Sequence, residues 1–348
     1  MNEGANTLIA ASSPHVASPV GTRNLMRDVI IALIPALCVA VFFFGPRALI
    51  ATVITVAACV FFEWAYRAIM KKSNTTGDLS AVITGILLAF VCPVTTPYWV
   101  LVIGAFFAIV VVKQLFGGLG KNFINPALGA RAFLMVCYPA QMNIWASPGV
   151  ENWAPLGMSV GKTYIDAYTS ATPLSSDFMG KGILPTASLG DMFVGNIGGC
   201  IGEVSALLLI VGGIYLLCRG VIRIRIPATF IITVAVLTFL FPMGDVSRVN
   251  WMLYELLGGG LMIGAFFMAT DYTTSPVTKR GELIYGIGCG VLTVFIRYFG
   301  AYPEGVSYAI LLMNICVWLI DKYGKPNRFG VSSEMRKAER AKKGGAAG

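Results

Sequence analysis

The chain has 348 residues, of which 56% are hydrophobic and only 12% are charged. Its mean hydropathy is +0.75 and its formal net charge is +9. A soluble domain carries about twice this charged fraction, so the composition excludes a soluble globular protein and indicates a polytopic membrane protein. A basic excess alone could suggest RNA binding, but no recognition module accompanies it, and we expect no nucleic-acid partner.

In chain order, the apolar stretches predict about ten transmembrane helices and therefore an all-α fold. A span needs about 20 mostly apolar residues, and several of these stretches are shorter. The predicted spans cover residues 29–44, 49–69, 79–91, 99–115, 123–138, 200–218, 227–241, 252–270, 283–299 and 306–320.

These spans divide the chain into five parts. Residues 1–22 lack an apolar core of the signal-peptide type and are predicted to be a cytoplasmic tail. A first transmembrane repeat is expected at residues 23–139, an extracytoplasmic loop at 140–199 and a second repeat at 200–321. Residues 322–348 are predicted to form a basic cytoplasmic tail.

The basic residues predict the orientation. If the N-terminus is cytoplasmic and each span reverses the chain, 20 of the 26 Lys and Arg residues lie inside and five lie outside. This is a strong positive-inside bias. The net charge then reflects membrane topology and attraction to anionic lipid.

The two halves of the chain resemble one another. The stretches "GILLAFVCPVTTP" (residues 85–97) and "GAFFMATDYTTSP" (residues 264–276) both place Gly and Pro twelve positions apart, with hydroxyl residues before the Pro. Each leads into an apolar span that ends near a basic residue, Lys113 or Arg297. Because the two copies run in opposite directions through the membrane, they predict two inverted five-helix repeats.

Polar residues inside the membrane are costly and therefore informative. In "GGLGKNFINPALGARAF" (residues 117–133), the glycines, Asn122, Asn125 and the following Pro predict a broken helix entry that can contact a ligand. Asp271 lies at the matching point of the second half. The alternative interpretation is that these residues only cap helix ends.

Three glutamates receive weaker assignments. Glu63 is predicted to pair with Arg67, four residues later on the same helix. Glu203 and Glu255 are expected near the outer ends of spans, within reach of water, as weak candidates for an ion path. No two of the eight cysteines form a Cys-x-x-Cys pair, so we predict no zinc or iron–sulfur site.

The long polar loop contains the stretch "YIDAYTSATPLSSD" (residues 164–177), a cluster of hydroxyls behind an aspartate. It has no His, Cys or basic residue, so it cannot be a self-sufficient active site. Such a cluster is usually a capped turn, but a loop of this length is more typical of a functional segment.

Several motifs together carry a resemblance to a known family. The runs "GGLGKNFINPA", "DAYTSATPL", "GEVSALLLIVGGIYLL", "GAFFMATD" and "IRYFGAYPEGVSYAILLMNI" resemble, in order, the D subunits of the Rnf ion-translocating ferredoxin:NAD+ oxidoreductase. The likeness covers about residues 23–321. It extends to the homologous B subunits of the sodium-pumping NADH:quinone oxidoreductase, although those usually have a longer N-terminal extension.

The resemblance implies a covalent FMN, joined through its phosphate to the hydroxyl of Thr172, which makes the chain a phosphoprotein. The family motif matches here at Asp166, Thr169, Ser170, Ala171 and Thr172. Family members often have Gly at the position of Ser170. An external flavin transferase would supply the activating groups that the loop lacks.

The resemblance also implies a noncovalent riboflavin in the membrane part. Asn122, Asn125 and Asp271 are the polar positions that we assign to it. The flavins supply the redox chemistry, so no side chain of this chain is assigned as catalytic.

The function implied is that of a translocase subunit in a bacterial or archaeal cytoplasmic (inner) membrane. It would relay electrons between ferredoxin and NAD+ through its flavins, coupled to Na+ or H+ translocation, with the other Rnf subunits as partners. The alternatives are the quinone-reducing relative, a non-redox channel or transporter of inverted-repeat fold, and a structural scaffold.

Overall fold

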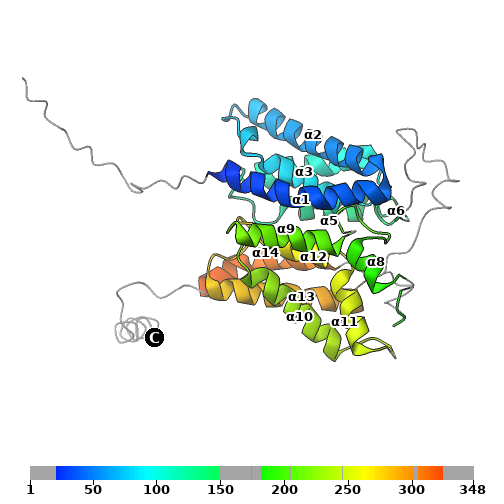
Figure 1. Cartoon of the computed structure of the whole chain (residues 1–348). Helices are drawn as coiled ribbons and strands as arrows, with labels where there is room; N and C mark the ends of the chain where they lie inside the picture. The colour runs from blue at the N-terminus through cyan, green and yellow to red at the C-terminus, as the bar shows by residue number, and fades with distance from the viewer. Residues whose placement is uncertain are drawn as a thin grey trace, which may run out of the picture.

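The computed structural model describes residues 21–146, 148, 174, 182–185, 187–203, 205–244, 246–300 and 305–323. Throughout these ranges the regular secondary structure is helical (Figure 1), as the sequence predicts for an all-α protein. An isolated antiparallel bridge joins Pro93 to Cys200. The amides of Ile201 and Gly202 donate to the carbonyls of Cys92 and Phe90, which satisfies backbone groups that lipid could not.

Two long helices open the first half of the fold. Gly45 has φ +75° and Pro46 follows at the first helical position, so the chain turns sharply between them. The elements of this half are α1 (Thr22–Phe44), α2 (Pro46–Ile69), η1 (Thr76–Asp78), α3 (Ser80–Phe90), α4 (Tyr98–Phe106), the π-helical η2 (Phe107–Gln114), α5 (Pro126–Cys137) and α6 (Pro139–Met142).

The described part of the second half contains a sharply broken helix. Its elements are α8 (Leu189–Val194), α9 (Ala206–Cys218), α10 (Arg225–Leu240), α11 (Arg248–Leu257), α12 (Leu261–Ile263), the π-helical η5 (Gly264–Met268), α13 (Lys279–Phe299) and α14 (Val306–Tyr323). Gly259 and Gly260 have φ of +62° and +68°, a conformation that favours glycine, and they form the break between α11 and α12.

Every stretch predicted to span the membrane contains a helix, but not all of these helices are long enough to cross alone. In the described part of the chain, α1, α2, α13 and α14 are long and apolar enough. The segment from α11 to η5 is a fifth candidate, bent by 62°. The helices α3, α4–η2, α5, α9 and α10 are shorter. The 11 residues of α3 rise about 16 Å, roughly half of the hydrocarbon thickness.

The two halves lie side by side, with α1–α6 in the upper part of Figure 1 and α9–α14 in the lower part. Helix α1 packs against α9, and α5 packs against α14. We call the end of the bundle where α1 begins and α9 ends the pocket end. The opposite end, which carries α6 and α8 (right in Figure 1), is the far end.

The broken helix is held at the far end by one buried ion pair. The guanidinium of Arg297 donates to the carboxylate of Glu255 at 2.6 Å and to the carbonyls of Glu255, Gly258 and Gly259. These carbonyls end α11 and would otherwise lack donors in the protein interior. The Glu255 side chain is only 2% exposed, so the prediction that water reaches it was wrong. The Glu203 side chain is also buried and pairs with Arg131 at 3.4 Å.

Candidate functional site: a pocket between the two halves

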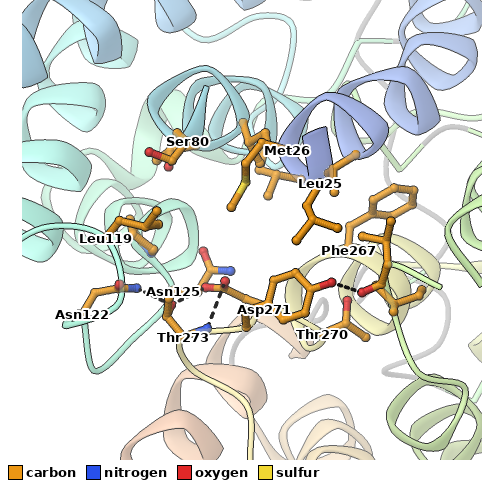
Figure 2. A pocket seen from close by; sticks show the side chains of 18 of the residues that line it. Leu25, Met26, Ser80, Leu119, Asn122, Asn125, Phe267, Thr270, Asp271 and Thr273 are labelled. Carbon is orange, nitrogen blue, oxygen red and sulfur yellow. Dashed lines mark hydrogen bonds between the residues drawn. The ribbon is translucent and has the colours of Figure 1, made fainter. Parts of the chain in front are cut away.

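A pocket lies between the two halves at the pocket end (Figure 2). Residues of α1, α3, η2, α9 and η5 line it, together with the segments before α5 and after η5. About 780 Å³ of space inside it is free of protein atoms, counting its open mouth. Its lining is mainly apolar with a few polar side chains that converge on it, which is the make-up of pockets that bind small molecules and cofactors.

Part of the wall is apolar. Leu25 and Met26 at the start of α1 and Phe267 of η5 face the space from one side (Figure 2). These side chains can cover the faces of a flat aromatic ligand and keep water from it. An aromatic edge at Phe267 also permits offset or edge-to-face ring contacts.

The opposite side is polar, and Asn122 and Asn125 belong to it. The Asn122 amide donates to Thr273 Oγ1 at 2.9 Å, which links the first half of the chain to the second. Asn125 caps α5, because its side-chain oxygen accepts from the amides of Ala127 and Leu128. The capping alternative therefore describes Asn125 correctly, and the same residue also lines the pocket.

Asp271 lines the same pocket from the segment that follows η5. Its carboxylate accepts hydrogen bonds from the hydroxyls of Thr273 (3.0 Å) and Thr274 (3.3 Å). A carboxylate held by hydroxyls keeps acceptor capacity for a ligand N–H or O–H. The structure thus brings Asn122, Asn125 and Asp271 together at one pocket, although Asp271 is about 150 positions away from the two asparagines.

Asn314 of α14 supports this polar side from behind. Both polar atoms of its side-chain amide form hydrogen bonds in one orientation. The nitrogen then donates to the carbonyl of Thr274 (3.1 Å), and the oxygen accepts from the backbone amide of Asn125 (3.2 Å). The hydroxyl of the buried Tyr285 lies 2.7 Å from the same side chain. One side chain therefore connects the two segments that carry Asn125 and Asp271.

A charged residue that the site prediction did not include also lines the pocket. Lys113 of η2 is 2% exposed, and its ammonium donates to Glu63 Oε2 at 2.9 Å and to Ser80 Oγ at 2.6 Å. The predicted pair of Glu63 with Arg67 was wrong, because Arg67 donates instead to Thr75. The signal for Lys113 was in the sequence, since an ionisable residue in an apolar span is a candidate site residue by default.

The predicted attachment motif, with Asp166, Thr169, Ser170, Ala171 and Thr172, lies outside the described residues. Leu174, which follows it closely, is described. Leu174 is buried in a small apolar cluster with Met192, Ile197, Trp251 and Tyr254, and it contacts the glycines of the α11–α12 break. This cluster is at the far end, opposite the pocket.

Apolar helices with broken segments buried between them, and a partly polar pocket at the junction of two halves, define the class as a multi-pass membrane protein. The family of the chain follows from comparison. A family model described as "NQR2, RnfD, RnfE family" matches residues 9–330. The chain belongs to this family.

Three relatives are similar over nearly their whole length. The D subunit of the Na(+)-translocating ferredoxin:NAD(+) oxidoreductase complex of Acetobacterium woodii is 44% identical, covering 95% of this chain and 98% of the relative. The D subunit of the proton-translocating complex of Clostridium ljungdahlii is 39% identical (93% and 97%). The D subunit of the ion-translocating oxidoreductase complex of Actinobacillus succinogenes is 34% identical (92% and 97%).

Proposed function

We propose that this chain is the D subunit of an ion-translocating ferredoxin:NAD+ oxidoreductase complex, in which it relays electrons through bound flavin. The observation that carries the proposal is its full-length identity of 44% and 39% with D subunits of that activity. Those two relatives are named for different ions, so the proposal covers Na+ or H+ coupling. The other subunits of the complex are the expected partners.

We propose that residues 23–139 and 200–321 are inverted repeats of five helices. Two matching contacts support this, because the first helices of the halves (α1 and α9) meet and so do the last (α5 and α14). In addition, α2 packs on α3 and α4, as α10 packs on α11 and α13. Each helix also runs opposite to its counterpart: α1, α3 and α5 begin at the pocket end, where α9, η5 and α14 finish.

The proposed orientation puts the pocket end at the cytoplasm and residues 140–199 outside, with both termini inside. The cationic ends of helices support it, since the pocket end carries the basic ends of α2, α9, α10 and α13. This distribution follows the positive-inside rule. The membrane would be the cytoplasmic (inner) membrane of a prokaryote.

We propose that the pocket binds a noncovalent flavin in the form of riboflavin, and the chemistry of its lining supports this. Its isoalloxazine edge needs amide-type donors and acceptors, which Asn122, Asn125 and Asp271 provide, and its ring faces need apolar cover, which Leu25 and Phe267 provide. The flavin, when bound, supplies electron transfer. The residues of this chain bind and orient it and exclude water from its faces.

The second proposed cofactor is FMN, joined by its phosphate to Thr172 in the loop at residues 140–199. Asp166, Thr169, Ser170 and Ala171 complete the motif that a flavin transferase would recognise. Small residues around the Thr172 hydroxyl allow the transferase to bind the segment in an extended conformation. Pro173 disfavours a helical conformation at Thr172. The quinone-reducing relative would share both flavins, and an acceptor assay or the neighbouring genes separate it from the ferredoxin:NAD+ enzyme.

Removal of the Thr172 hydroxyl tests the electron-relay function. Thr172→Ala should abolish the flavin fluorescence of the denatured band on a gel while the chain still inserts, because a loop hydroxyl contributes little to folding. Ser170→Gly is the control and should keep the fluorescence, whereas Asp166→Ala should reduce it only in part. A channel or scaffold would show no fluorescence in the unmutated chain, and undiminished fluorescence in Thr172→Ala would refute the attachment point.

A further inference from the structure

A ligand that fills the pocket displaces water from it, and a flavin takes up protons when it is reduced. The apolar side chains of Leu25, Met26 and Phe267 cannot supply protons. Protons can then reach the ligand from water at the open mouth of the pocket or through polar groups of its wall, and the wall is the route that side chains can control. In the described ranges, the charged side chains that line the pocket are Lys113 and Asp271. They differ in the groups to which their hydrogen bonds lead.

Behind Lys113 is a short chain of hydrogen bonds that leads out of the pocket. The Lys113 ammonium donates to Ser80 Oγ at 2.6 Å, and the Ser80 hydroxyl donates to Asp78 Oδ1 at 2.5 Å. Ser80 also lines the pocket (Figure 2), whereas Asp78 does not line it and is half-exposed. Two hydrogen bonds therefore lead from Lys113 in the pocket wall, through Ser80, to the Asp78 carboxylate, which water can reach.

A second branch holds Lys113 in place. Glu63, which is 1% exposed, accepts from Lys113 with one oxygen and from Gln114 and Thr75 with the other, both at 3.0 Å. Burial of a carboxylate and an ammonium is tolerated only when both are paired and hydrogen-bonded. Arg67 Nε in turn donates to Thr75. The neighbouring Cys59 thiol is buried on α2.

Asp271 is held differently from Lys113 within the described part of the chain. The hydrogen bonds to its carboxylate come from Thr273 and Thr274 in its own turn, and none of them leads to a half-exposed acid. The two hydroxyls fix the geometry of the carboxylate, which suits it to accept a hydrogen bond from a ligand. The two charged residues of the pocket therefore differ in their surroundings: only the hydrogen bonds of Lys113 continue to an acid outside the pocket.

We propose that Lys113, Ser80 and Asp78 form a proton path from the cytoplasmic surface to the ligand of the pocket, with Glu63 as the residue that positions Lys113. The inference rests on the proposed binding of a flavin in this pocket. It adds a function, proton delivery, and assigns it to residues outside the predicted site.

The transfer conserves charge and atoms at each step. Electrons arrive at the ligand from other redox centres of the complex, and none passes along this path. One N–H bond of Lys113 breaks as its proton goes to a basic nitrogen of the reduced ligand. Hydronium at the surface protonates the Asp78 carboxylate and leaves a water molecule. The neutral amine then takes the Ser80 hydroxyl proton while the Ser80 oxygen takes the proton of the Asp78 carboxyl, which restores the Ser80 hydroxyl and the Asp78 carboxylate. Proton relays built from such side chains are a recognised use of ionisable groups in membranes.

Proton uptake measured after rapid reduction tests the path. The full chain is used in a Thr172→Ala background, which removes the proposed covalent FMN, so that the signal comes from the pocket. A flash-generated reductant is applied in weakly buffered detergent solution, and a soluble pH-sensitive dye reports the uptake. Asp78→Asn and Ser80→Ala should each slow uptake by about a hundredfold, the lower end of general acid–base effects.

Two controls separate proton delivery from a structural effect. Asp28→Asn removes a different acid, a buried one at the pocket end whose carboxylate accepts hydrogen bonds from Arg219 and Tyr215, and it should leave the rate unchanged. Addition of a small weak acid such as formic acid should restore the rate in Asp78→Asn. A merely structural role for Asp78 would give no such rescue.

Acid-extractable flavin is measured on every preparation. If Asp78→Asn and Ser80→Ala take up protons at the unmutated rate while they keep their flavin, the path is refuted. If the Thr172→Ala chain itself contains no extractable flavin, the proposed flavin site fails instead. Asp78 does not line the pocket, so its substitution should leave the flavin content intact. Failure of the proton path can therefore be told apart from failure of the flavin site.

Discussion

At the residue scale, Asn125 both caps α5 and lines the pocket, and the flavin content of a variant tests whether it also binds flavin. Asn125→Leu removes the cap of α5 and the polar edge of the pocket, and it adds bulk there. We expect loss of most acid-extractable flavin, with the Thr172-linked flavin retained on the precipitated protein. Asp271→Asn should also lower the extractable flavin, because an amide replaces a full carboxylate acceptor at the pocket edge.

The matched control for Asn125 is Ser205, the N-cap of α9 at the far end. Its hydroxyl accepts from the amide of Leu208 at 3.4 Å. Ser205→Ala should cost about 1 kcal/mol of stability, as is typical for a lost cap, without changing the flavin content. Unchanged extractable flavin in both Asn125→Leu and Asp271→Asn would mean that these residues serve only the helix ends.

At the scale of elements, the break between α11 and α12 depends on the Arg297–Glu255 pair. Arg297→Met leaves the Glu255 carboxylate buried without its cation and the carbonyls of Gly258 and Gly259 without a donor. We expect the free energy of unfolding to fall by about 3–5 kcal/mol. Denaturant unfolding of the purified chain in mixed micelles, followed by Trp fluorescence, measures the change.

The double variant Arg297→Met, Glu255→Leu is the internal control for this element. Because it removes both charges, it should recover a large part of the lost stability, since replacing a buried ion pair by apolar side chains is often neutral. A single variant that loses less than about 1 kcal/mol would show that the pair is not what stabilises the break.

At the scale of the whole molecule, the orientation of the two halves predicts which parts are accessible from each side. A membrane-impermeant thiol reagent should label an engineered Ser176→Cys from outside. Ser333→Cys should be labelled only after the membrane is opened, because residues 322–348 are predicted to be cytoplasmic. The native exposed cysteines, such as Cys38 and Cys137, are first replaced by Ser.

The reverse labelling pattern would mean that the protein has the opposite orientation in the membrane. It would place the pocket and the proton path at the outer face and the Thr172 loop inside. A flavin in the pocket could then not take up protons from the cytoplasm through Asp78. The labelling experiment therefore also tests the side of the membrane on which proton uptake occurs.

The sequence by itself determined the fold class and the positions of the helices. Long apolar stretches can satisfy their backbone in a membrane only as helices, so composition and hydropathy were enough for this. Local chemistry also identified Asn125 as a helix start, since Asn followed by Pro is a typical capping pattern. The positions of Asn122 and Asp271 at predicted breaks between helices indicated a ligand site.

Only the tertiary structure decided which of these residues meet. Asn122 bonds Thr273 across 151 positions, and Glu63 pairs with Lys113 across 50 positions rather than with its neighbour Arg67. Side-chain pairing in the membrane interior follows from packing and desolvation, because a buried charge must find its partner wherever the fold brings one. Sequence spacing identifies partners on one helix and cannot choose between helices, so Lys113 and its path to Asp78 became visible only in the folded chain.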